Sequence, residues 1–283
     1  MLLAIKLSGK VLEDQEPRRR LCLQLSDLVQ SGHKLLVVHG GGKQLSDFSH
    51  RLGIIAVQYQ GRRVTDEPTL KLAKMVFSAI NRDLVAGLMA TGTPAIGMSS
   101  FDAGIVYCRR RPPIPIQTLD PANQKETHLI DFGLVGEVEG INIEPLEAFW
   151  EFGLTPVMNC LGADREGQIF NVNADTLAAE LAVALKADRL IGVSDVDGVY
   201  LTPRDPSTRI AQMTSAEAYR YVQEGRFYGG MVPKIESALD VLRRGVASVQ
   251  IVSGIREGAL LEGVKGQAGT SIVQDRPTKK KRR

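Results

Sequence analysis

Short apolar runs alternate with stretches of helical periodicity along the chain, and this alternation restricts the fold more than any other feature. Leu2–Leu7 and Lys34–His39 read as buried strands, and a helical stretch follows each of them. Arg189–Ser194 and Ser248–Ser253 repeat the pattern in the second half. Strands that are separated by helices pair in parallel. The sequence therefore predicts the α/β class, with a mainly parallel sheet covered by helices on both faces.

Glycine and proline mark the ends of the predicted helices and the least regular part of the chain. Helices are predicted over 17–31, 67–91 and 145–152, and a glycine follows each of them. Residues 57–65 predict a short hairpin. Four prolines between residues 99 and 132 interrupt any helical pattern, so this segment is predicted to form hairpins and loops.

The composition excludes several classes of protein. The 283 residues contain no apolar run that approaches the roughly 20 residues needed to span a bilayer, so no membrane association is predicted. Cys22, Cys108 and Cys160 are scattered along the chain without the spacing of metal ligands. Such a pattern is typical of reduced thiols, so we expect a cytoplasmic protein without a disulfide framework or a protein-bound metal.

The basic character of the chain lies at its C-terminus. Residues 276–283 carry six lysines and arginines and no acid, which exceeds the formal net charge of +3 and leaves the rest of the chain mildly acidic. We expect this tail to be a disordered, solubilising end. A weak contact with nucleic acid or an acidic partner is the alternative. No aromatic residue accompanies the charges to stack on bases, so nucleic-acid binding is not predicted.

Strand ends and helix starts carry residue types that bind phosphate and carboxylate groups. Lys6 ends the first strand, at the edge where α/β proteins bind ligands, and Gly9 allows close approach of the backbone. Residues 40–42 are three glycines between a strand and a helix, so their N–H groups can form a nest for an anion. Lys234 lies at the start of another helix, where a cation opposes the helix dipole unless an anion is bound nearby.

The other polar residues in these loops could bind a ligand or could have a purely structural role. Arg62 and Arg63 could clamp a carboxylate, or they could be the solvated charges of a hairpin. Asn171 and Asn173 lie two residues apart in an extended segment and so point to the same side. Asp175 could cap the following helix or hold lysines in place. The residues alone leave these alternatives open.

Seven short motifs occur in order along the chain: Lys6-Leu-Ser-Gly9, His39-Gly-Gly-Gly42, Arg63-Val-Thr65, Gly133-Leu-Val-Gly-Glu-Val138, Asn171-Val-Asn-Ala-Asp175, Ser194-Asp-Val196 and Gly230-Met-Val-Pro-Lys234. Together, over about residues 1–274, they resemble the amino-acid kinase family, and within it the members that act on N-acetylglutamate. The resemblance implies an open αβα sandwich with two lobes. Residues 1–167 would form the lobe for the acyl amino acid and residues 168–275 the lobe for ATP, with 276–283 as the tail.

The resemblance also implies roles for individual residues. Lys6 and Lys234 would stabilise the transferring phosphoryl group, and Asp175 would organise both lysines. The acylglutamate would be held by Gly41, Gly42, Arg63 and Asn171. The nucleotide site would be lined by Gly9, Asp195, Val196, Asp197, Gly198, Val199, Tyr200, Arg226, Phe227 and Tyr228.

The implied reaction is the ATP-dependent phosphorylation of the side-chain carboxylate of N-acetyl-L-glutamate, the second step of arginine biosynthesis. That carboxylate is already a nucleophile, so the reaction requires no general base. Its barrier lies in bringing one anion against another, and cations and N–H groups lower such a barrier. Mg²⁺ is expected to arrive bound to ATP.

Three departures from the family pattern lie in the acceptor lobe. Ser100-Phe-Asp-Ala-Gly104 replaces a Gly-Lys-Asp-Gly run, Lys43 stands where proline is usual, and Arg109-Arg-Arg111 is unfamiliar. They leave two other acceptors open: N-succinylglutamate, and aminoadipate or glutamate bound to an acidic carrier protein.

A non-catalytic sensor that binds arginine or nucleotide is the alternative from another functional class. The intact set of Lys6, Lys234 and Asp175 argues against it. The chain also starts directly at its first strand, without the N-terminal helix that joins arginine-inhibited relatives into hexamers. A homodimer without strong arginine feedback is therefore expected.

Overall fold

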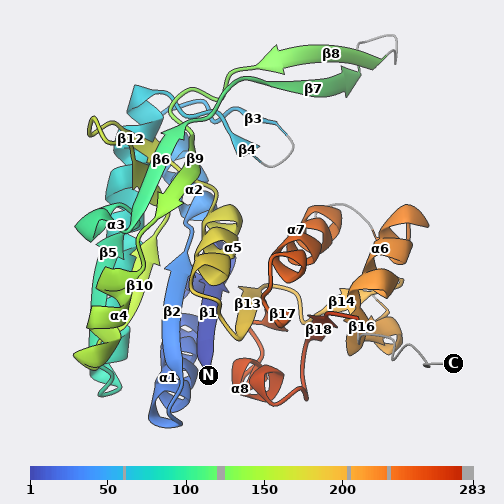
Figure 1. The fold of residues 1–283 in the computed structure, drawn as a ribbon. Helices are drawn as coiled ribbons and strands as arrows, with labels where there is room; N and C mark the ends of the chain where they lie inside the picture. Colours follow the sequence, from blue (N-terminus) through green and yellow to red (C-terminus); the bar gives the residue numbers. More distant parts are fainter. Residues whose placement is uncertain (60–61, 120–124, 203–204, 228–230, 276–283) are drawn as a thin grey trace, which may run out of the picture.

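An eight-stranded sheet forms the centre of the molecule in the part of the chain that the computed structural model describes, residues 1–59, 62–119, 125–202, 205–227 and 231–275. Figure 1 shows the sheet with helices packed around it. From one edge to the other its strands are β16 (Gln212–Thr214), β18 (Thr270–Val273), β17 (Ser248–Ser253), β13 (Arg189–Ser194), β1 (Leu2–Leu7), β2 (Lys34–His39), β10 (Thr155–Asn159) and β5 (Ala95–Ser99).

The pairing within this sheet is parallel except between β17 and β18, which confirms the predicted α/β class with a mainly parallel sheet. β1 has β2 on one side and β13 on the other. Its consecutive residues Leu3, Ala4 and Ile5 are all fully buried. Strands buried on both faces need apolar residues at consecutive positions, and the leucine-rich runs of β1 and β2 meet this need.

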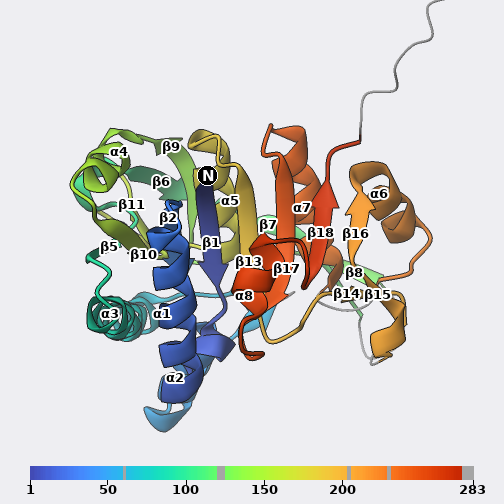
Figure 2. The ribbon, with the colours of Figure 1, turned by 90° about the horizontal axis from the view of Figure 1, so that it is seen from below.

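Helices cover both faces of the sheet, as predicted. Figure 2 shows helices on both sides of the strands. One side carries α1 (Gln15–Gln30), α3 (Glu67–Ala90) and α8 (Ala259–Val264), and the other carries α4 (Glu144–Glu151), α5 (Ala174–Ala184) and α7 (Met231–Arg243). In α5, Leu177 and Leu181 recur every four residues and are fully buried, so this helix lies on β1 with its apolar face.

Two further helices and several small sheets complete the fold. α2 (Gly42–Arg51) follows β2 directly, and α6 (Ser215–Gln223) follows β16 with a capping box at Thr214 and Glu217. A four-stranded sheet consists of β12 (Ile169–Asn171), β11 (Leu161–Ala163), β6 (Val106–Arg110) and β9 (Gly136–Ile141). The two-stranded pairs are β3 (Gln58–Tyr59) with β4 (Arg62–Arg63), β7 (Ile114–Leu119) with β8 (Lys125–Ile130), and β14 (Val199–Tyr200) with β15 (Arg209–Ile210). Short 3₁₀ helices span Gly9–Leu12, Asp102–Gly104 and Pro206–Thr208.

The hairpins predicted over 57–65 and within 99–132 are present as β3–β4 and β7–β8, and the second of them projects from the body of the molecule (Figure 1). β9 begins at Gly136, after Gly133 with a positive φ of 70° and a bend at Leu134. α5 begins at Ala174, because Asn173 caps it. The predicted tail, 276–283, lies outside the described residues. Among the described helices, none has the length and apolar character to cross a membrane.

Candidate active site

The carboxyl ends of the central strands meet at one edge of the sheet, and the candidate residues lie there. Leu7 at the end of β1 pairs with His39 at the end of β2 and with Val193 near the end of β13. The segments that follow these strands carry Gly9, the three glycines after His39, and Asp195. Parallel pairing thus brings together groups that are far apart in the sequence, at the edge where open α/β sheets bind ligands.

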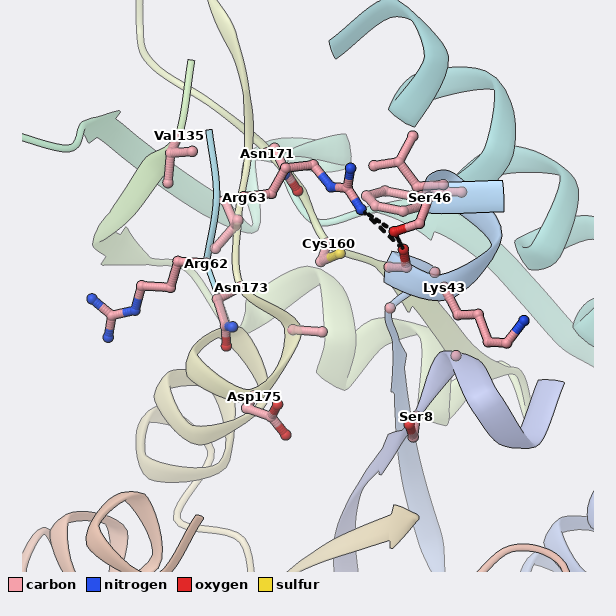
Figure 3. Close-up of a pocket in the computed structure, with 18 of the residues that line it drawn as sticks. Ser8, Lys43, Ser46, Arg62, Arg63, Val135, Cys160, Asn171, Asn173 and Asp175 are labelled. Carbon is pink, nitrogen blue, oxygen red and sulfur yellow. Dashed lines mark hydrogen bonds between the residues drawn. The ribbon is translucent and has the colours of Figure 1, made fainter. Parts of the chain in front are cut away.

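A cavity of about 440 Å³ opens at this edge between β1, α2, β4 and the start of α5. All four residues predicted to hold the acyl amino acid line it. Figure 3 shows the cavity with Arg63 and Asn171 on one side and Asp175 at the start of α5. The charged side chains of its lining are Lys6, Lys10, Lys43, Arg62, Arg63, Arg111 and Asp175, so cations outnumber acids and the cavity favours an anionic ligand.

Two of the glycines after β2 shape the floor of this cavity. Gly41 is the N-cap of α2, and a Cβ atom there would lie within 2.9 Å of side-chain atoms of Phe77 and Ile80. A Cβ atom at Gly42, the first residue of the helix, would meet nothing within 4 Å. Gly41 is therefore required by close packing, whereas the space beside Gly42 stays open to the cavity.

One guanidinium nitrogen of Arg63 is hydrogen-bonded to α2, and another is available for a ligand. Its Nη2 donates to the carbonyl oxygen of Gly42 at 3.2 Å and to Ser46 Oγ at 2.5 Å. Its Nη1 is buried and has no hydrogen-bond partner in the part of the chain that the structure describes. Burial lowers the pKa of the Arg63 guanidinium. A buried cation with an unsatisfied donor at a cavity wall is well placed to bind a carboxylate.

Asn171 and Asn173 both line the cavity but have different roles. Asn171 Nδ2 donates to Thr65 Oγ1 at 3.1 Å, which fixes the amide beside β4. Asn173 Oδ1 accepts from the backbone N–H of Thr176 at 2.9 Å and caps α5. The cap is thus Asn173 and not Asp175, and Asp175 lies in the first turn with its carboxylate free for the lysines.

A second cavity of about 340 Å³ lies between α5, α7 and the strands β13 and β17. Lys6, Lys234 and Ser194 line it, together with an apolar wall that includes Leu190, Val193, Val249 and Ile251. Lys6, Arg62, Asn173 and Asp175 line both cavities. The two cavities therefore meet at these four residues.

The two predicted phosphoryl-binding lysines both line the second cavity, Lys6 from β1 and Lys234 from α7. Lys6 Nζ is 2.7 Å from Asp175 Oδ1, and Lys234 Nζ donates to Ser194 Oγ at 3.0 Å. Burial, and then the charge of Lys6, lowers the pKa of Lys234, while Asp175 and Asp195 oppose the shift. Asp175 thus pairs directly with Lys6 and acts on Lys234 through its charge, whereas the hydrogen-bond partner of Lys234 is Ser194.

Asp195 connects Lys234 with a third lysine. Ser194 Oγ donates to Asp195 Oδ1 at 3.0 Å, and Lys10 Nζ is 2.7 Å from Asp195 Oδ2. Burial alone would raise the pKa of Asp195, but the hydrogen bonds from Lys10 and Ser194 lower it. Asp195 remains ionised and organises Lys10, next to Gly9 in the lining of the first cavity.

The other described residues that were predicted for the nucleotide do not line either of these two cavities. Val199 and Phe227 are buried, the first with its N–H donated to Thr270 Oγ1 and the second with its ring edge-on to Tyr221. Tyr200 donates to Asp197, and Arg226 pairs with Glu224 at 2.6 Å. Val196 and Gly198 lie in the same loop after β13, and Tyr228 lies outside the described residues.

Sequence reasoning missed a buried polar pair beneath the glycines. Asn81 Nδ2 donates to His39 Nε2 at 3.1 Å and to the carbonyl oxygen of Val157 at 3.0 Å, so His39 Nδ1 is the donor to the Gly40 carbonyl at 3.0 Å. Both side chains are almost completely buried. The sequence held one signal, because Asn81 interrupts the buried face of α3 four residues after Phe77 and three before Leu84.

No group of three or more His, Cys, Asp or Glu side chains is arranged to hold a metal ion in the part of the chain that the structure describes. The three cysteines are free and buried, and burial raises the pKa of Cys160, which lines the first cavity, to about 12. A thiol with such a pKa is a poor nucleophile. The reactive features of the site are therefore its amines, guanidinium groups and carboxylates.

Comparison with known proteins agrees with this geometry. The model of the amino acid kinase family matches residues 1–253. The acetylglutamate kinase of Anaeromyxobacter dehalogenans strain 2CP-1 is 39% identical, covering 96% of this chain and 99% of its own, and that of Myxococcus xanthus is 37% identical, covering 97% and 89%. Among solved structures, N-acetylglutamate synthase from Neisseria gonorrhoeae has the same fold, with a TM-score of 0.80 at 24% identity, and this chain spans 59% of that chain. The chain belongs to the amino acid kinase family.

Proposed function

We propose that the chain transfers the γ-phosphoryl group of ATP to the side-chain carboxylate of N-acetyl-L-glutamate, the second step of arginine biosynthesis. The observation that carries the proposal is the junction of the two cavities, where Lys6 meets Asp175 and which Lys234 approaches from α7. The relatives named acetylglutamate kinase match the chain over nearly its full length and support the choice of acceptor.

The first cavity suits the acceptor. Arg63, with its free Nη1, and Asn171 are placed to hold the α-carboxylate, and the open space beside Gly42 accommodates the rest of the molecule. The second cavity suits ATP, because it combines an apolar wall with Lys234 and Lys6. Most of the first lining comes from residues 1–167 and most of the second from residues 168–275, which supports the division into an acceptor lobe and an ATP lobe, with Asn171 reaching the acceptor from the ATP lobe.

The side chains of the junction act on the reaction through charge. The acceptor carboxylate attacks the γ-phosphorus without a general base, and two anions must approach each other. One favourable pair of unit charges 4 Å apart contributes about 4 kcal/mol at an effective dielectric constant near 20. Lys6 and Lys234 therefore offset much of the repulsion, and Asp175 keeps Lys6 in place. Mg²⁺ enters as part of the substrate MgATP and neutralises charge on the phosphates.

Trapping of the acyl phosphate tests the proposal. The chain is incubated with MgATP, hydroxylamine and one acceptor at a time, and the hydroxamate is measured by its colour with iron. N-acetylglutamate is expected to give product. A higher rate with N-succinylglutamate, or with aminoadipate or glutamate on a carrier protein, would replace the proposed acceptor. Absence of product with every acceptor, together with binding of arginine or ATP, would identify a sensor and contradict the kinase.

Two further expectations belong to this proposal. ATP is a cytoplasmic substrate, and we place the activity in the cytoplasm. We also expect a homodimer, and light scattering of the purified protein tests it, because the mass of a hexamer would contradict the expectation.

A further inference from the structure

Arg62 has an unusual position among the four residues that line both cavities. Lys6 and Asp175 pair with each other at 2.7 Å, and Asn173 caps α5. Arg62 is the remaining charged residue of the junction, and within the described residues its guanidinium has no hydrogen bond or ion pair. It is half-buried, so water compensates its charge only in part. A cation in this situation is a binding group for an anion that arrives with a substrate.

The surroundings of Arg62 make its charge unfavourable in the empty protein. Burial, and then the charge of Arg111, lowers the pKa of Arg62, and Glu137 opposes the shift. Glu137 is already engaged, since its Oε1 forms an ion pair with Arg111 Nε at 3.1 Å and its Oε2 accepts from Arg109 Nη2 at 3.4 Å. The nearby acid therefore does not neutralise Arg62, and an additional anion between the cations would relieve their repulsion.

The direction of the side chain indicates which substrate brings that anion. Arg62 and Arg63 are neighbours on β4, and successive side chains of a strand point to opposite sides. Figure 3 shows Arg63 extending toward Ser46 and Arg62 extending away from it. Arg63 lines the first cavity but not the second. Arg62 lines both cavities, and in the second it is accompanied by Lys6 and Lys234. Arg63 thus serves the acceptor, and Arg62 faces the group that passes between the cavities.

We propose that Arg62 is a third cation on the transferring phosphoryl group, supplied by the acceptor lobe in addition to Lys6 and Lys234. The inference rests on the proposed phosphoryl transfer. An oxygen of the acceptor carboxylate forms a bond to the γ-phosphorus, the bond from that phosphorus to the β,γ-bridging oxygen breaks, and ADP leaves with the electron pair. No proton moves. The Arg62 guanidinium donates hydrogen bonds to the non-bridging oxygens, where negative charge is concentrated during the transfer.

Replacement of Arg62 by leucine tests this role in turnover. The kcat of Arg62→Leu is expected to fall about 100-fold, as is usual when one donor to a developing charge is removed, with little change in the KM for the acceptor. Arg62→Lys keeps the charge without the fork and is expected to recover part of the loss. Arg110→Leu is the matched control, because Arg110 is an exposed neighbour that pairs with Asp131 and lies outside both cavities, and its kcat is expected to stay within a factor of two of the wild type.

Stability distinguishes a functional from a structural role. Removal of a half-buried cation without a partner relieves its repulsion with Arg111, so the melting temperature of unliganded Arg62→Leu is expected to equal or exceed that of the wild type. A large decrease would show that Arg62 supports the fold and would overturn the proposal.

Nucleotide binding tests the inference without any acceptor. By calorimetry, Arg62→Leu is expected to bind AMP-PNP with Mg²⁺ about tenfold more weakly than the wild type and to bind ADP with Mg²⁺ equally well. Equal effects on both nucleotides, or none on either, would overturn the role at the γ-phosphoryl group, as would a kcat that stays unchanged while the acceptor KM rises. If no acceptor gives product, the proposed function fails, and the comparison of AMP-PNP with ADP still decides the position of Arg62.

Discussion

Lys234 is held by Ser194, whose hydroxyl oxygen accepts from the lysine Nζ at 3.0 Å. The same hydroxyl donates to Asp195 Oδ1 at 3.0 Å, and Asp195 Oδ2 accepts from Lys10 at 2.7 Å. Within the junction of the two cavities, Lys6 and Asp175 form a separate pair. The site therefore has two carboxylates that hold its lysines, and Ser194 joins the buried lysine to one of them.

Replacement of Ser194 by alanine is expected to lower kcat about tenfold. The variant removes one hydrogen bond from a charged and partly buried amine, and such bonds contribute about 1.5–3 kcal/mol. Lys234 itself remains, so Lys234→Ala is expected to be much more severe. The two variants are compared by steady-state kinetics with MgATP and N-acetylglutamate at saturation. A Ser194→Ala enzyme as slow as Lys234→Ala, or as fast as the wild type, would contradict the positioning role.

Replacement of Lys6 by alanine is expected to reduce kcat by about 100-fold or more, with a much smaller effect on the KM of either substrate. The charge of Lys6 matters most when the phosphoryl group is between donor and acceptor, and a contact made in the transition state appears in kcat. Asp175→Asn leaves the lysine but removes its partner at 2.7 Å, so its loss of kcat should be smaller. Equal losses in kcat and in substrate affinity for Lys6→Ala would indicate a binding role instead.

Gly41→Ala and Gly42→Ala are expected to separate packing from catalysis. The added methyl group at Gly41 would lie within 2.9 Å of Phe77 and Ile80 side-chain atoms, and such overpacking costs about 1–3 kcal/mol. At Gly42 the methyl group meets open space, so stability to urea should be unchanged. It would, however, enter the acceptor cavity and raise the KM for N-acetylglutamate. Equal urea midpoints for the two variants would show that the floor of the cavity tolerates an outward shift of Gly41.

The fold follows from the sequence because its strands are buried on both faces and need apolar residues at consecutive positions. For this reason Leu2–Leu7, Lys34–His39 and Arg189–Ser194 have the predicted bounds. Short elements escaped prediction, among them β11 and α8. A three-residue strand and a six-residue helix carry too few residues for a periodic signal, and tertiary contacts stabilise them.

Residues of the candidate site were predictable where their type, at the end of a strand or the start of a helix, points to anion binding. Lys6, Lys234 and the glycines are of this kind, and the structure brings them to one sheet edge. The bonds among them were not predictable, because each joins distant segments: Lys234 to Ser194, Lys10 to Asp195, and Asn81 to His39. The predicted nucleotide residues Val199 and Phe227 are buried in the core, where their side chains stabilise the loop instead of facing a cavity.

His39 is expected to make the protein sensitive to mild acid. Burial lowers the pKa of His39 from 6.5 to about 4, although its hydrogen bond to Gly40 opposes the shift. The unfolded chain therefore binds a proton below pH 6.5 that the folded chain rejects until about pH 4. Stability is complete above pH 6.5 and falls as the pH decreases through this window, by about 2–3 kcal/mol at pH 4.5.

Urea unfolding at pH 7 and pH 4.5 measures this loss. His39→Asn places an amide donor near the Gly40 carbonyl and cannot titrate, so the variant should lose about 2–3 kcal/mol less than the wild type between the two pH values. His50→Asn, on the exposed face of α2, is the matched control and should follow the wild type. If the free energies of unfolding of wild type and His39→Asn fall in parallel, the carboxylates alone cause the acid sensitivity, and His39 is protonated in the folded protein at little cost.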